Sequence, residues 1–146
     1  MSTADRTDPY LGFRFRVELE SLIVAGFAEV SGLAVELETE PYEEGGVNEF
    51  THTLPTRLGH SNVTLRHGVT DSEELWEWMD AARHGTVDRK WGRIILLDAT
   101  GADARGWEFR EGFPVRWEGP QLTADGRAVA IETLEIAHHG LDRYDV

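Results

Sequence analysis

The feature that most constrains this chain is a two-residue alternation of apolar and polar side chains that recurs along its length. Residues 13–20 and 33–40 alternate in this way, and weaker versions occupy residues 62–67, 107–117 and 129–138. Because successive side chains of a strand point to opposite faces, this period predicts strands with one buried face. The chain is therefore expected to fold mainly as β-sheet.

One segment follows a helical period instead. Leu75, Trp78, Met79 and Ala82 have the spacing of a single helix face, and residues 70–74 offer capping and acidic first-turn residues. The pattern predicts one helix of about thirteen residues, an ordinary length. Many strands and one helix predict two packed antiparallel sheets that form a sandwich or barrel with a flanking α-helix.

A different composition marks the segment from Pro41 to His60. It contains two adjacent glycines, Pro55 and few large apolar residues, which predicts a long inter-strand loop, with a short strand near residues 49–54 as an option. Loops of this length inside a compact domain are uncommon and are usually functional. The length of the chain predicts a single domain spanning residues 1–146. Residues 1–9 are expected to form a flexible amino-terminal arm.

The composition excludes some classes of protein. Acidic residues number 27 against 14 basic ones, for a formal charge of −13, whereas a nucleic-acid-binding surface needs an excess of Lys and Arg. Lys90 is the only lysine, which is consistent with a GC-rich genome, with adaptation to high salt, or with both. The chain has no cysteine, and therefore neither a disulfide framework nor a thiolate metal site.

The sequence also bears on where the protein is made. The first twenty residues contain no basic segment followed by an apolar one, and the longest apolar run, residues 94–97, is too short to span a bilayer. We therefore expect synthesis and folding in the cytoplasm, and no insertion of the isolated subunit into a membrane.

No catalytic motif is present. The chain lacks the nucleophile-elbow, zinc-protease, phosphate-loop and dinucleotide-binding patterns. None of the six histidines pair four residues apart on the predicted helix. The sequence predicts no enzyme activity, no metal site and no cofactor.

Trp76 leaves two interpretations open. It lies two residues before Trp78, about 200° away around a helix, and so falls outside the apolar stripe. Either the helix buries a wide face beneath a sheet, or Trp76 contacts another subunit, since tryptophan is frequent at interface hot spots.

Several segments, taken together, resemble the tail-tube proteins of contractile phages and of phage-tail-like extracellular injection systems. They are DPYLGFRFRVE at 8–18, GFAEVSGL at 26–33, YEEGG at 42–46, Leu54-Pro55, NVTLRHGVTD at 62–71, Leu75-Trp76 with Trp78, Phe113-Pro114 with WEGP at 117–120, and IETLEIA at 131–137. The resemblance spans nearly the whole chain. It implies the fold deduced above, six subunits in a ring, and rings stacked into a tube inside a contractile sheath.

The resemblance also implies roles for particular residues. The loop at residues 41–60 is expected to reach a neighbouring subunit or ring through the anchors Tyr42, Val47, Phe50, Leu54 and Leu58, with Trp76 as a further candidate contact. The acidic face made by Glu36, Glu38 and Glu40 is expected to line a water-filled lumen. The implied partners are other copies of the chain, the sheath and the baseplate, with cargo in the lumen as an option, in a particle that the cell can release.

Two other functions remain open at this point. A tube-initiator subunit at the baseplate would share the fold and the motifs, and its copy number in purified particles would identify it. A small β-barrel ligand-binding domain would instead need a cavity with converging polar groups, and no set of residues here indicates one.

Overall fold

The structure is a computed structural model that describes residues 8–42 and 52–146. Over these residues the chain forms strands and one helix in the order β1 (Phe15–Leu19), β2 (Phe27–Ser31), β3 (Val35–Tyr42), β4 (His52–His60), β5 (Val63–Gly68), α1 (Glu74–Arg83), β6 (Lys90–Leu97), β7 (Asp103–Glu118), β8 (Ile131–Ala137) and β9 (Gly140–Tyr144).

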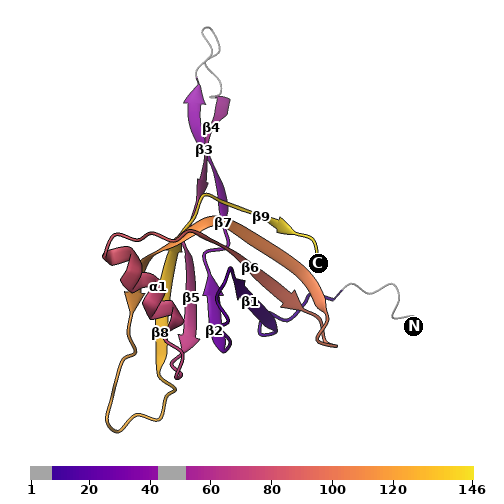
Figure 1. The fold of residues 1–146 in the computed structure, drawn as a ribbon. Coiled ribbons are helices and arrows are strands. Elements are labelled where there is room, and N and C mark those ends of the chain that lie inside the picture. The colour runs from indigo at the N-terminus through magenta and orange to yellow at the C-terminus, as the bar shows by residue number, and fades with distance from the viewer. Residues whose placement is uncertain (1–7, 43–51) are drawn as a thin grey trace, which may run out of the picture.

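Two antiparallel sheets share the long strand β7 (Figure 1). The first half of β7 pairs with β6 and β9, and its second half pairs with β8. Strand β1 extends the first sheet beyond β6, while β5 and then β2 extend the second sheet beyond β8. The predicted class of two antiparallel sheets with one flanking helix is confirmed for the residues that the structure describes.

A bend in β7 lets one strand serve both sheets. Glu111 has a φ of 52° at the bend, and Gly112 follows it. The fully buried Phe109 ring lies against both Gly92 and Gly112, and a Cβ at either glycine would overlap that ring. The close approach of backbone and ring therefore requires glycine at both positions.

The core lies between the two sheets and is closed at one side by α1. Leu75 and Trp78, on the predicted helix face, are buried in it, and the Trp78 indole N–H donates to the Asp88 carbonyl oxygen at 2.7 Å. The other members are apolar residues of six strands: Val17, Leu19, Val63, Leu65, Ile94, Phe109, Leu134, Ile136 and Leu141. Helix α1 is shorter than predicted, with 10 residues, because it begins only at Glu74.

Strands β3 and β4 form a two-stranded hairpin that projects from the body (Figure 1). The prediction of a loop from Pro41 to His60 is therefore wrong for residues 41–42 and 52–60, which belong to β3 and β4. The optional short strand near residues 49–54 overlaps β4 at residues 52–54, and its other residues lie outside the described part of the chain. Pro55 lies beside a β-bulge, where the Thr56 hydroxyl donates to the Glu38 carbonyl oxygen at 3.1 Å. A proline is tolerated at a bulge in a ribbon of two edge strands, so it does not end β4.

The environment of β3 also differs from the prediction. Residues 33–40 were expected to bury one face in their own subunit, yet every position of β3 is exposed. Val35 and Leu37 are 54% and 56% exposed. An alternating pattern predicts which side chains share a strand face, but not whether anything covers that face.

Two shorter segments have structures that no clear sequence pattern indicates. The mostly polar carboxyl-terminal segment contains β9, whose backbone pairs with β7. Residues 23–26, although partly apolar, lie outside the strands, and β2 begins at Phe27.

We predict that Gly92→Ala destabilises the fold, because the added methyl group overlaps the buried Phe109 ring. Overpacking of this kind costs about 1–3 kcal/mol of unfolding free energy. Urea unfolding of the monomer measures it, and Gly12→Ala is the matched control because a Cβ there meets nothing within 4 Å. Equal stability of the two variants would contradict this packing.

We also predict that the double substitution Leu37→Ser and Leu58→Ser leaves the stability of the monomer nearly unchanged. Both side chains are more than half exposed, and exposed substitutions usually change stability by less than about 0.5 kcal/mol. In the same urea experiment, Leu65→Ala, at a fully buried position, should cost about 2–5 kcal/mol. A comparable loss in the hairpin variant would mean that the hairpin is part of the core.

Candidate assembly surfaces

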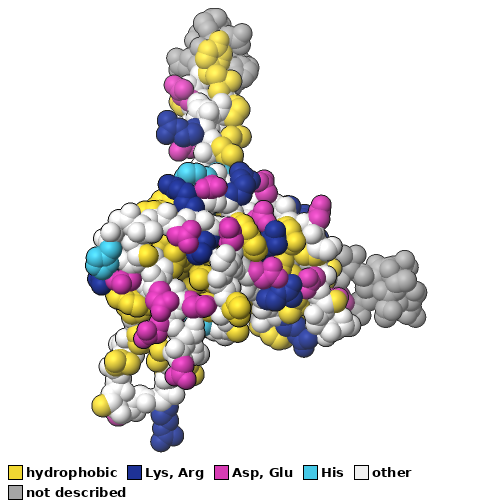
Figure 2. Space-filling view, in the orientation of Figure 1, with side chains coloured by type: hydrophobic (Ala, Val, Ile, Leu, Met, Phe, Trp, Pro, Cys, Tyr) yellow, Lys and Arg dark blue, Asp and Glu magenta, His cyan; other side chains and the backbone are white. Residues whose placement is uncertain are grey.

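The hairpin has one apolar face and one acidic face. Leu37 lies directly opposite Leu58, and Val35 lies on the same face two residues earlier. Alternation along β3 puts Glu36, Glu38 and Glu40 on the other face, where Arg57 lies 3.8 Å from Glu38. Figure 2 shows hydrophobic side chains along one side of the hairpin and charged ones along another. This ribbon can therefore offer an apolar strip to a partner while its acidic face stays in water.

The candidate contact residues do not form one cluster. Leu58 lies on the apolar face, whereas Leu54 pairs with Glu40 and so shares the acidic face with Tyr42. Val47 and Phe50 lie outside the described residues. Val35 and Leu37, which the sequence pattern predicted to be buried, complete the apolar strip. Their alternation with Glu36 and Glu38 was the available signal.

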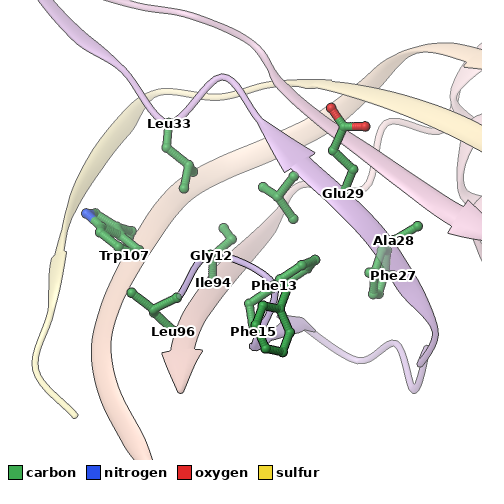
Figure 3. A pocket seen from close by; sticks show the side chains of 11 residues that line it. Gly12, Phe13, Phe15, Phe27, Ala28, Glu29, Leu33, Ile94, Leu96 and Trp107 are labelled. Atoms are coloured by element: carbon green, nitrogen blue, oxygen red, sulfur yellow. The ribbon is translucent and has the colours of Figure 1, made fainter. Parts of the chain in front are cut away.

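A second apolar surface lies where the sheet path ends. Strands β1 and β2 are the two ends of the path β1-β6-β7-β8-β5-β2 and do not pair with each other. Between them is a cleft of 520 Å³ whose lining includes Phe15, Phe27, Leu33 and Trp107 (Figure 3). Phe13, at the mouth, is 69% exposed. The cleft and the unpaired strand edges form a surface on which a further strand or apolar segment can pack.

Trp76 packs within its own subunit. Its ring lies 4.8 Å from that of Trp117, at an interplanar angle of 67°, and the Arg83 guanidinium lies 5.0 Å above it. The half-buried side chain fits the interpretation of a wide buried helix face. A contact between Trp76 and another subunit stays a prediction.

The buried polar groups form a structural network. His67 is 1% exposed, and its Nε2 lies 2.6 Å from the Ala25 carbonyl oxygen, which can only accept, so Nε2 carries a hydrogen. Its Nδ1 lies 2.8 Å from Glu132 Oε1, and the Trp117 indole N–H donates to Glu132 Oε2 at 2.9 Å. These bonds connect β5, β7, β8 and the segment before β2, and they occupy both ring nitrogens and both carboxylate oxygens.

The outer faces of the sheets carry ion pairs between strands. Arg16 donates two hydrogen bonds of 3.0 Å to Asp103, and this contact lowers the pKa of the Asp103 carboxyl group. Arg93 donates to Glu108 at 2.6 Å, and its guanidinium stacks 4.3 Å from the Tyr144 ring. With these arginines already paired, the excess acidic charge of the chain is left on the surface.

Within residues 8–42 and 52–146, no three histidine or acidic side chains group so as to hold a metal ion. No helix in this part of the chain is long and apolar enough to cross a membrane.

Solved structures share this fold. The chain is 25% identical to a chain in the cryo-EM structure of an extracellular contractile injection system, the PVC sheath-tube complex in the extended state, with a TM-score of 0.87 and coverage of 100% of this chain and 99% of that one. It is also 25% identical to a chain in the baseplate of the anti-feeding prophage, with a TM-score of 0.84 and coverage of 95% and 97%. Hcp1 from Flavobacterium johnsoniae, at 18% identity, TM-score 0.64 and coverage of 90% and 94%, shares the fold.

A search of curated proteins finds no match. The family model of the T4-like virus tail tube protein gp19 matches residues 11–142, which include the body, the hairpin strands and the cleft. This chain belongs to the T4-like virus tail tube protein gp19 family.

Proposed function

We propose that this protein is the structural inner-tube subunit of a contractile phage-tail-like injection system and that it assembles as hexameric rings stacked around a central lumen. Membership of the tail tube family supports the role in a tube. Similarity over the full chain to a chain of a sheath-tube complex supports a contractile machine.

The observation that carries the proposal is the unsupported hairpin. A two-stranded ribbon is at best marginally stable alone in water, and this one exposes about half or more of Val35, Leu37 and Leu58. Burial of apolar surface contributes roughly 25 cal/mol per Å². A neighbouring subunit that covers this strip stabilises the hairpin and the assembly together.

The separation of the two apolar surfaces supports an extended assembly. The hairpin strip and the cleft between β1 and β2 are different parts of the subunit, so a contact between them joins unlike surfaces. Contacts of this kind close into rings or continue as open stacks. The β7–β8 loop lies at the end of the molecule opposite the hairpin (Figure 1), and it exposes 80% of Leu122 and 75% of Val129. Each end of the subunit thus exposes apolar side chains that a subunit of the next ring can cover.

The acidic face of the hairpin fits the water-filled side of such a tube. In this proposal Glu36, Glu38 and Glu40 face the lumen while the apolar strip faces a neighbouring subunit. The particle also contains sheath and baseplate proteins, and the subunit acts by its shape and contacts without catalysis. A negative wall repels acidic cargo, and so disfavours adhesion to the tube.

A tube-initiator subunit at the baseplate is the second candidate. The chain is nearly as similar to the baseplate chain as to the sheath-tube chain, with TM-scores of 0.84 and 0.87. Copy number separates the two roles, because an initiator occupies one position in a particle whereas a tube subunit repeats along its length. Quantitative mass spectrometry of purified particles, with the sheath protein as the internal standard, measures that number.

We predict that the purified protein forms six-fold rings and tubes when salt screens its charge of −13. Leu37→Glu with Leu58→Glu should abolish the tubes and leave a folded subunit, because both charges lie on the strip that a neighbour covers. Negative-stain electron microscopy and mass photometry measure assembly.

The matched control is Val87→Glu, which adds a charge at a residue that is 48% exposed, between α1 and β6. It should assemble like the unchanged protein. Monomers at every salt concentration up to molar would contradict assembly itself. Normal long tubes from the Leu37 and Leu58 variant would contradict the role of the hairpin.

A further inference from the structure

The hairpin is joined to the body at its base, where β4 ends at His60 and β5 begins at Val63. Here His60 meets His138, which follows β8. We propose that His60 and His138 form a pH-dependent hinge that holds the hairpin in one orientation while both rings are neutral and releases it when they are protonated. Any effect of the hinge on tube assembly rests on the function proposed above. The hinge itself is a property of the single subunit.

His138 donates one hydrogen bond and accepts another, and together these two bonds favour its neutral form. Its Nε2 lies 2.9 Å from the carbonyl oxygen of Ser61, in the link between β4 and β5, so Nε2 carries the hydrogen and donates it. The backbone N–H of Gly140 donates to Nδ1 at 3.1 Å, so Nδ1 is an acceptor. A proton added at Nδ1 would face the Gly140 N–H, and that bond would break.

His60 connects the hairpin to this site. Its ring centroid lies 5.3 Å from that of His138, and it is on the apolar face of the hairpin, directly opposite Val35. The Nδ1 atom of His60 is buried and has no hydrogen-bond partner. Two neutral rings can pack at this distance, whereas a positive charge on each would repel the other across a partly buried contact.

The other groups around His138 strengthen this dependence on charge. From β7, the Phe109 ring packs 5.7 Å from His138, and Arg110 adds a positive charge that is shared with Asp142 of β9 through an ion pair. The next residue, His139, contacts Arg89. Among these, Asp142 is the one negative group, and Arg110 already pairs with it.

Burial lowers the pKa of His138 below its usual value, and the charges of His60 and Arg110 lower it further, against the opposing effect of the Ser61 carbonyl. A histidine with a lowered pKa in the folded state stabilises that state at pH values above its unfolded pKa of about 6.5. This stabilisation is lost as the pH falls through the folded value. The hinge is therefore closed at neutral pH and opens in acid.

The experiment measures the hairpin directly. Because the chain has no cysteine, Thr53→Cys on β4 and Glu77→Cys on α1 give two unique, exposed sites for spin labels. Double electron–electron resonance on monomers, at low protein concentration, gives the distance distribution between hairpin and body at about pH 8 and about pH 5. We expect one narrow distribution at the higher pH and a broadened or shifted one at the lower pH.

Two substitutions test the assignment. His60→Phe keeps an aromatic ring but cannot be charged, so its distribution should broaden less in acid than that of the unchanged protein. The control His84→Gln, at the exposed end of α1, should broaden as the unchanged protein does. Nitrogen-15 shifts of the histidine rings should show the Nε2–H form of His138 at the higher pH.

Identical distributions at both pH values would overturn the hinge, as would His60→Phe behaving like His84→Gln. These outcomes are independent of tube formation, since the measurement uses monomers. If the hinge opens in acid but tubes never form at any pH, the proposed function fails and the hinge stands. If tubes form and the distance distribution does not change with pH, the proposed function stands and the hinge fails.

Discussion

The packing of Phe109 against Gly92 and Gly112 is the contact on which the rest of the body depends. Strand β7 can belong to both sheets only if it bends, and the bend brings the ring onto the backbone of β6 and of β7 itself. The ring is fully buried, and it fills the space where the sheets separate. Without that close approach the two sheets would not share a strand, and α1 would lose the β7 surface it covers.

The body and the hairpin are stabilised in different ways. The body buries its apolar residues between two sheets and satisfies its buried His67 and Glu132 with hydrogen bonds inside the subunit. The hairpin has backbone pairing across its strands but an exposed apolar strip, and its base rests on the contact between His60 and His138. A segment of this kind gains most of its order from what it binds.

Sequence patterns predicted the body well because periodicity reports which side chains share a face. The helix face of Leu75 and Trp78 and the alternating strands are recognisable in the sequence alone. The same patterns could not predict the location of β3, since Val35 and Leu37 alternate with glutamates whether or not a sheet covers them. Strand β4 was predicted only in part, as an optional short strand near residues 49–54, because Pro55 and the bulge break the two-residue period. The histidine contact depends on residues 78 positions apart, which no local pattern reports.

The charge of the chain and its apolar surfaces have opposite effects on the association of subunits. A formal charge of −13 keeps subunits apart, and the arginines on the sheet faces already pair within the subunit, so few remain to attract a neighbour. In the proposed assembly, association comes from apolar burial at the hairpin strip, the cleft and the β7–β8 loop, which are separate parts of the surface. Unlike surfaces that meet in this way do not form a closed pair, because each new subunit leaves its own strip uncovered. An assembly of such subunits ends only where the contacts close into a ring or where a different protein covers the last strip.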